Sequence, residues 1–122
     1  MSDRKPAEAR VVSNSTLVVD DELRPYQVVE LIDEDDQLIA RYSRYLNIEE
    51  TAWVRHGVWQ SFAPNGQVVS RGNYTRGQEH GPWQDFHDNG QLAAEGRYDI
   101  GKEVGCWKYW DRNGQLESQE EK

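Results

Sequence analysis

Apolar and polar residues alternate with a period of two through the second half of the chain, which is typical of β-strands that bury one face. At every second position, residues 68–74 carry Val, Ser, Gly and Tyr, and residues 92–98 carry Leu, Ala, Gly and Tyr. The positions between them are mostly polar. We therefore expect strands with one apolar face and one mostly wet face. The small residues leave room on the apolar face, and a neighbouring Trp ring would fill it.

A unit of 24 residues occurs nearly three times in succession between His56 and Leu116. Trp59, Trp83 and Trp107 follow one another at this spacing, and so do the three Asn-Gly pairs. A fixed period without insertions indicates a tandem repeat. Asn-Gly between two strands is a strong hairpin signal. The pattern therefore predicts an all-β fold: a single twisted antiparallel β-meander built from tandem 24-residue hairpins.

The turn of each hairpin carries further information. The first is Ala63-Pro64-Asn65-Gly66. Proline suits the first central position of a type I turn, asparagine suits the second, and glycine then takes a left-handed bulge position. We therefore favour a type I turn with a glycine bulge over the two-residue mirror-image turn.

Residues 29–45 resemble a degenerate copy of the hairpin, with Asp36 in the place of the turn glycine. Aspartate is among the few residues that accept a left-handed conformation. This copy lies six residues further from the next one than the period requires. We place the extra residues in Asn47–Arg55, as a loop or a short helical turn capped by Asn47.

The remaining N-terminal sequence is less regular. We expect a flexible arm over residues 1–15, because they are polar and mixed in charge. Short strands are expected at Leu17–Val19 and Tyr26–Ile32. The predicted organisation is thus the arm, then N-terminal strands and a degenerate capping hairpin over 16–55, then three repeats and a short acidic tail over 56–122. All three parts belong to one domain.

Composition and net charge limit the classes of molecule that this protein is expected to bind. The chain has 122 residues, 36% of them hydrophobic, and a net charge of −8. This charge argues against nucleic acid and against an anionic membrane as the main partner, since both are bound through Lys and Arg side chains. A single cysteine, Cys106, excludes an internal disulfide and a cysteine metal cluster. No signal peptide and no membrane span is recognised, so we expect a cytoplasmic protein.

Residues 20–36 hold eight acidic residues against one arginine, Arg24. A metal site is disfavoured because the run lacks the spacing, the glycine and the closing glutamate of a calcium-binding loop. Two interpretations stay open: solvated turns that protect a sheet edge, and a docking patch for a basic partner. Four consecutive acids are the candidates for that patch: Asp33, Glu34, Asp35 and Asp36.

The aromatic residues are the second candidate for partner contact. Trp59 and Phe62 are three residues apart, so their side chains point to opposite faces unless a bulge rotates both inward. The first case would leave a row of rings at every second strand, about 9–10 Å apart. The candidate residues are Trp59, Phe62, Trp83, Phe86, Trp107 and Trp110.

No catalytic residue, metal ligand or cofactor site is predicted. His56 and His80 occupy the same repeat position, about 9–10 Å apart across two strands, which is too far to share one zinc ion. No nucleophile motif or phosphate-binding glycine loop occurs. We therefore expect a protein that is not an enzyme.

The string Gly81-Pro-Trp-Gln-Asp-Phe-His-Asp-Asn-Gly-Gln-Leu92, with Gly96, Tyr98, Gly101 and Lys102, resembles the MORN-repeat variant. This variant occurs in bacterial proteins commonly labelled antitoxin components of the YwqK type. The resemblance covers about residues 56–118, and residues 29–45 weakly. It implies an antiparallel hairpin array that contacts other proteins.

Together these observations predict a protein-binding module of antitoxin or immunity type, which neutralises a basic partner such as a toxin. The alternative is a structural repeat protein that forms homo-oligomers. A membrane-surface adaptor is disfavoured by the charge.

Overall fold

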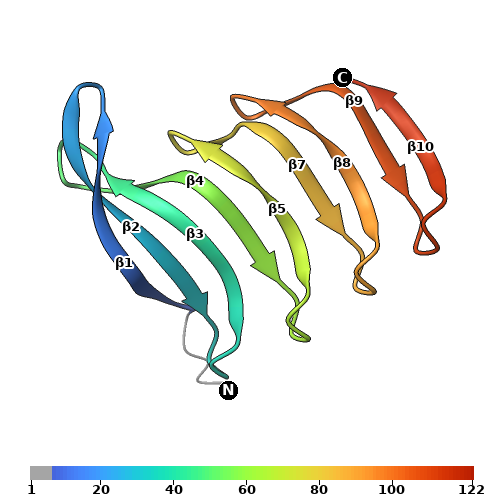
Figure 1. Cartoon of the computed structure of the whole chain (residues 1–122), viewed down its shortest axis with the longest axis horizontal. Helices are drawn as coiled ribbons and strands as arrows, with labels where there is room; N and C mark the ends of the chain where they lie inside the picture. The colour runs from blue at the N-terminus through green and yellow to red at the C-terminus, as the bar shows by residue number, and fades with distance from the viewer. Residues whose placement is uncertain (1–6) are drawn as a thin grey trace, which may run out of the picture.

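The computed structural model describes residues 7–122 as one open antiparallel sheet, without a helix in that part of the chain. The strands follow one another in chain order across the sheet (Figure 1), which confirms the predicted all-β meander. They are β1 (Glu8–Val19), β2 (Glu22–Ile32), β3 (Leu38–Leu46), β4 (Trp53–Phe62), β5 (Val68–Thr75), β6 (Gln78–Glu79), β7 (Gly81–Phe86), β8 (Leu92–Asp99), β9 (Lys102–Trp110) and β10 (Leu116–Glu121). The short β6 pairs with β5 only.

The three regular hairpins use the predicted turn. In the first, the amide of Gly66 donates to Ala63 O at 2.8 Å, and Gly66 has φ 86° while Asn65 has no positive φ. The other two turns, at residues 87–90 and 111–114, repeat this bond and a glycine φ of 85°. A mirror-image turn would need two successive positive φ angles. The prediction of a type I turn with a glycine bulge is confirmed.

The degenerate copy of the hairpin is also confirmed. The amide of Asp36 donates to Asp33 O at 3.1 Å, and Asp36 adopts φ 60° in place of the turn glycine. Ile32 pairs with Leu38 beside a register shift, as Phe62 pairs with Val68 in the first regular repeat. The same turn is therefore built here from a different, acidic sequence.

Two N-terminal expectations differ from the structure. The arm expected over residues 1–15 is wrong for Glu8–Ser15, which belong to β1 and pair with β2; residues 1–6 lie outside the described part. The extra residues are expected in Asn47–Arg55, but residues 53–55 already belong to β4. Residues 47–52 form the connecting loop, and Asn47 Oδ1 accepts the amides of Thr51 and Ala52 at 2.9 and 3.2 Å.

The links between repeats are tight turns on the opposite rim of the sheet from the Asn-Gly turns (Figure 1). Arg76 and Gly77 have φ 50° and 87°, and Ile100 and Gly101 have φ 47° and 80°. Two successive positive φ angles define the mirror-image type I turn, which matches the twist of the paired strands. The two rims of the sheet therefore carry two different kinds of turn.

The core is a layer of side chains on one face of the sheet. Cross-strand pairing places Trp59 opposite Gly72, and Trp83 opposite Gly96. Each glycine also receives the Trp of the next repeat, because a Cβ at Gly72 or Gly96 would lie 2.0 or 2.1 Å from a ring carbon of Trp83 or Trp107. The predicted filling of the small-residue gap by a Trp ring is confirmed.

Candidate functional site

An aromatic ladder crosses the apolar face. It consists of Tyr42, Trp59, Tyr74, Trp83, Tyr98 and Trp107. Successive ring centroids are 5.3–5.8 Å apart, and most neighbours meet edge to face, the arrangement that the ring quadrupole favours. The tyrosines fill the gaps between the tryptophans. The row is therefore continuous, rather than a set of isolated rings two strands apart.

The three ladder tryptophans differ in what they offer a partner. Trp83 and Trp107 are 8% and 2% exposed, while Trp59 is only half-buried. Each indole N–H has an acceptor within the chain: Trp59 Nε1 donates to Ser70 Oγ at 3.3 Å, and Trp107 Nε1 donates to Arg97 O at 3.2 Å. Rings this well covered hold neighbouring repeats together. Their part in partner contact stays a prediction.

The second aromatic of each repeat lies on the other face. Arg41 and Arg71 both pair with Gln60, whose side chain points away from that of Trp59. These arginines cover the rings of Phe62 and Phe86 at 5.8 and 5.2 Å. Phe62 and Phe86 therefore share the polar face. The tryptophan and the phenylalanine of a repeat thus point to opposite faces of the sheet, and no bulge rotates both rings inward. Trp110 holds the equivalent position and pairs with Leu116.

One exposed cation covers part of the ladder. Arg55 lies over the rings of Trp59, Tyr42 and Tyr74 at 4.7, 5.3 and 5.6 Å. A guanidinium over aromatic faces is attracted by the ring quadrupole. Arg55 thus closes the ladder where the regular repeats meet the degenerate hairpin.

The acidic turn, Asp33–Asp36, connects β2 and β3. Asp33 Oδ1 accepts the amides of Asp35 and Gln37 at 2.8 and 2.9 Å, so Asp33 has a structural role. Asp111 makes the same two bonds in the last repeat. Glu34, Asp35 and Asp36 are exposed, and Asp36 has only a distant ion pair with Arg10 at 4.0 Å.

The acidic run of residues 20–36 is divided by the fold. Asp20 and Asp21 form the β1–β2 turn at one rim, and the acidic turn lies at the other end of β2. Ten residue steps of extended strand separate the two groups by about 33 Å. The run is thus two clusters, one at each of two turns on opposite rims of the sheet.

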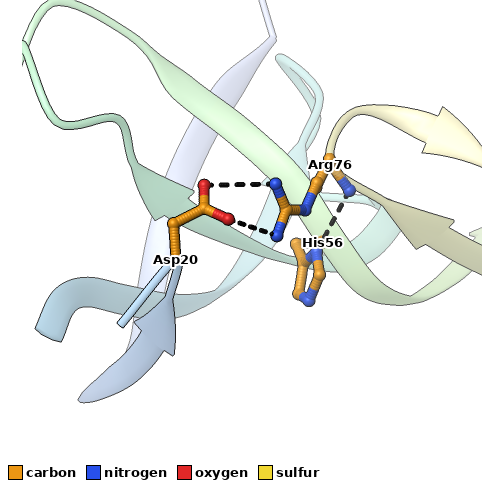
Figure 2. Close-up of polar contacts among 3 residues, drawn as sticks. All are labelled: Asp20, His56 and Arg76. Carbon is orange, nitrogen blue, oxygen red and sulfur yellow. Dashed lines mark hydrogen bonds and ion pairs between the residues drawn. The ribbon is translucent and has the colours of Figure 1, made fainter. Parts of the chain in front are cut away.

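The first cluster has a structural partner. Arg76 Nη1 and Nη2 donate to the carboxylate of Asp20, at 3.1 and 2.8 Å, and the amide of Arg76 donates to His56 Nδ1 at 3.1 Å (Figure 2). Asp20 raises the pKa of Arg76 by this bond and by its charge. Burial, and then the charge of Arg76, lower the pKa of His56.

The histidine position repeats this arrangement. His80 Nδ1 accepts the amide of Ile100 at 3.3 Å, 24 residues after the bond between His56 and Arg76. Both histidines therefore tie a link turn to the strand that begins the same repeat. Within residues 7–122, no three His, Cys, Asp or Glu side chains are placed to hold a metal ion. No helix of that part is long and apolar enough to cross a membrane.

Asp85 is an acid that the sequence pattern did not single out. It follows Trp83 on the apolar face, and Trp83 Nε1 donates to Asp85 Oδ1 at 3.2 Å. Burial raises the pKa of Asp85; the bond from Trp83 opposes the increase, and the charge of Glu103 adds to it. Its position, two residues after the ladder Trp, is the only signal that could have identified it.

The basic residues of the polar face were also missed as a group. Arg71, Arg97 and Lys108 lie on three different strands, β5, β8 and β9, and line one groove. Their alternation with apolar-face residues predicts a common face. The net charge of the chain is negative, so composition alone does not reveal a basic face.

Comparison with known proteins agrees with the hairpin array. The family model described as the MORN repeat variant matches residues 55–75, 79–99 and 103–121, together half of the chain. Searches of curated proteins and of solved structures each found no match. The matched segments coincide with the three regular hairpins, and repeats of this family are generally modules that bind proteins or membranes. The chain therefore belongs to the MORN repeat variant family.

Proposed function

We propose that this protein binds a basic partner protein through the acidic turn, and that it acts as an antitoxin or immunity protein that neutralises this partner in the cytoplasm. The observation that carries the proposal is the comparison of turns within the chain. Ala63-Pro64-Asn65-Gly66 and Asp33–Asp36 form the same turn, so the backbone geometry does not require four acids. Asp36 even occupies a left-handed position that glycine fills at less cost.

Electrostatics support a role in association. Exposed carboxylates on a protein of net charge −8 steer a basic partner and raise its association rate. Such steering falls steeply as salt screens the charges. Phe62 and Trp59, partly exposed on opposite faces of β4, are the nearest rings of the regular repeats and the candidates for short-range contact.

The test compares two variants of equal charge. Asp35→Asn with Asp36→Asn removes two charges from the acidic turn, and asparagine tolerates the left-handed position of residue 36. The matched control is Glu117→Gln with Glu121→Gln, on the exposed β10 at the other end of the sheet. Each variant is used to capture partners from the cells that produce the protein, and the association rate of the captured protein is measured against NaCl concentration.

We expect a basic partner, a wild-type association rate that falls with salt, and a lower rate for the acidic-turn variant only. Equal rates for the two variants, or a wild-type rate that ignores salt, would contradict the proposal. The antitoxin part is tested separately by expressing the partner alone and with the chain. Growth inhibition by the partner alone, relieved by co-expression, is the expected result.

Self-association is the second candidate function. The outer edge of β1 has no pairing strand within the described chain, and Val11 and Val12 on it are 40% and 54% exposed. The other edge is less suited to continue the array. Glu120 faces Trp107 where the earlier repeats have Gly72 and Gly96, so no gap for a further Trp ring exists there. Light scattering over a concentration series distinguishes a monomer from an oligomer, and a monomer at all concentrations would contradict this candidate.

A further inference from the structure

A groove of about 750 Å³ lies on the polar face of β4, β5, β7, β8 and β9. The backbone at Gly72 and Gly96 contributes to its lining, and Val58 and Pro82 add exposed apolar surface. Five adjacent strands span about 19 Å, the length of about six residues of extended peptide. The groove is thus of a size for a short segment of chain.

The groove is basic although the protein is acidic. Its charged lining is Arg71, Arg97 and Lys108 against Glu95 alone. The side chain of Gln84 bridges Arg71 and Glu95. Its Oε1 accepts from Arg71 Nε at 2.7 Å, and its Nε2 donates to Glu95 Oε2 at 2.6 Å. These bonds fix Arg71 and Glu95 to the groove wall.

The other two cations have no such partner. Arg97 and Lys108 are exposed, and neither side chain has an ion pair or a hydrogen bond within the described residues, although Lys108 is the cross-strand neighbour of Glu95. A surface that holds two unpaired cations beside apolar side chains is complementary to carboxylates next to apolar residues.

We propose that this groove binds a short, extended, acidic peptide segment of a partner protein. Carboxylates of the segment pair with Arg97 and Lys108, and an apolar side chain packs against Val58. This surface is separate from the acidic turn, so it adds a second specificity to the proposed function and does not depend on it.

The surroundings of the groove favour a peptide over a long polyanion. The rims of the sheet carry acids at both ends of the strands, including Asp88 and Asp111 at one rim and Glu79 and Asp99 at the other. A nucleic acid or a flat anionic membrane covers more of the sheet than the groove and meets these carboxylates, which repel it. A six-residue segment stays within the basic region.

The test uses a fluorescein-labelled hexapeptide of four glutamates and two valines, with a peptide of four lysines and two valines as the control ligand. Binding is followed by fluorescence anisotropy at low salt. The groove variant is Arg97→Gln with Lys108→Gln. Its matched control is Arg10→Gln with Lys102→Gln, which removes the same charge from exposed sites outside the groove. Circular dichroism verifies that both variants are folded.

We expect the acidic peptide to bind, and the groove variant to weaken binding about tenfold, as for the loss of two partly screened ion pairs. The matched control should change binding less than twofold. No binding of the acidic peptide, equal binding of the lysine peptide, or equal losses in the two variants would overturn the proposal. Tighter, groove-dependent binding of a single-stranded DNA oligomer or of phosphatidylserine vesicles would overturn it as well.

Cys106 provides an independent test of location. It is the only cysteine of the chain, it is exposed, and it lines the groove. The acidic peptide at saturating concentration should slow the alkylation of Cys106 by iodoacetamide, a neutral reagent. An alkylation rate unchanged by a bound peptide would place the peptide elsewhere and refute the assignment.

Discussion

Gly96→Ala tests whether the close approach of Trp107 holds the last two repeats together. An added Cβ would lie 2.1 Å from Trp107 Cδ2 and 2.2 Å from Cε2. The backbone of Gly96 has no positive φ, so alanine causes no backbone strain there. The effect of the substitution is therefore confined to the ring. Trp107 has to move by more than about 1 Å before its carbons reach contact distance.

The structure leaves little room for this movement. Trp107 is 2% exposed, its ring centroid is 5.3 Å from that of Tyr98, and its Nε1 donates to Arg97 O. Overpacking of this kind costs about 1–3 kcal/mol. The lower entropy of the unfolded alanine variant returns about 0.4–1 kcal/mol. We expect the free energy of unfolding to fall by about 1–2 kcal/mol.

The assay is urea denaturation followed by circular dichroism, in a double-mutant cycle with Trp107→Leu. Leucine removes the flat ring, so Gly96→Ala in that background should be neutral or should stabilise by up to about 1 kcal/mol. An unchanged free energy of unfolding for Gly96→Ala in the wild-type background would refute the reasoning. So would a penalty that is the same with and without the Trp107 ring.

Three further predictions follow from other contacts. Because the pKa of His56 is lowered in the folded state, neutral His56 favours folding; this contribution is present above the ordinary histidine pKa of 6.5 and is lost as pH falls through the folded value. Thermal denaturation between mildly acidic and neutral pH should therefore show a pH dependence that His56→Gln reduces, and an unchanged dependence would contradict the assignment. Asp36→Gly should raise the free energy of unfolding by about 0.5–1 kcal/mol, because it removes a left-handed aspartate at φ 60°; Gly66→Asp is the reverse control and should destabilise. Arg55→Met keeps the aliphatic packing but removes the cation over three rings, so we expect a loss of about 1 kcal/mol in urea denaturation, and equal stability would show that the charge contributes nothing.

Much of the fold could be predicted because its information is local. The Asn-Gly pairs and Pro64 specify the hairpin turns within four residues, and the backbone angles at Gly66 agree. The same turn logic identified Asp36 as a glycine substitute. β1 was missed over residues 8–15 because its mostly polar residues, all of them exposed, carry no periodic pattern, and its pairing with β2 is a tertiary contact.

The candidate site was predicted less well. The sequence showed eight acids in one run, but the extended backbone of β2 separates them into two clusters on opposite rims. It showed six aromatic candidates of equal standing, but the ladder covers Trp83 and Trp107 and leaves Phe62 and Phe86 under arginines on the other face. The basic groove draws on five strands, and no window of the sequence contains its charges together.

The sequence by itself determined the repeat, its turns and the two faces of its strands, because the turn conformations and the alternation of side chains depend on near neighbours along the chain. The tertiary structure alone decided which rings are covered and which charges meet. Both depend on the cross-strand register, which brings Trp107 over Gly96 and gathers Arg71, Arg97 and Lys108 around one groove. Burial and electrostatic potential are sums over neighbours in space, so they appear only once the strands are paired.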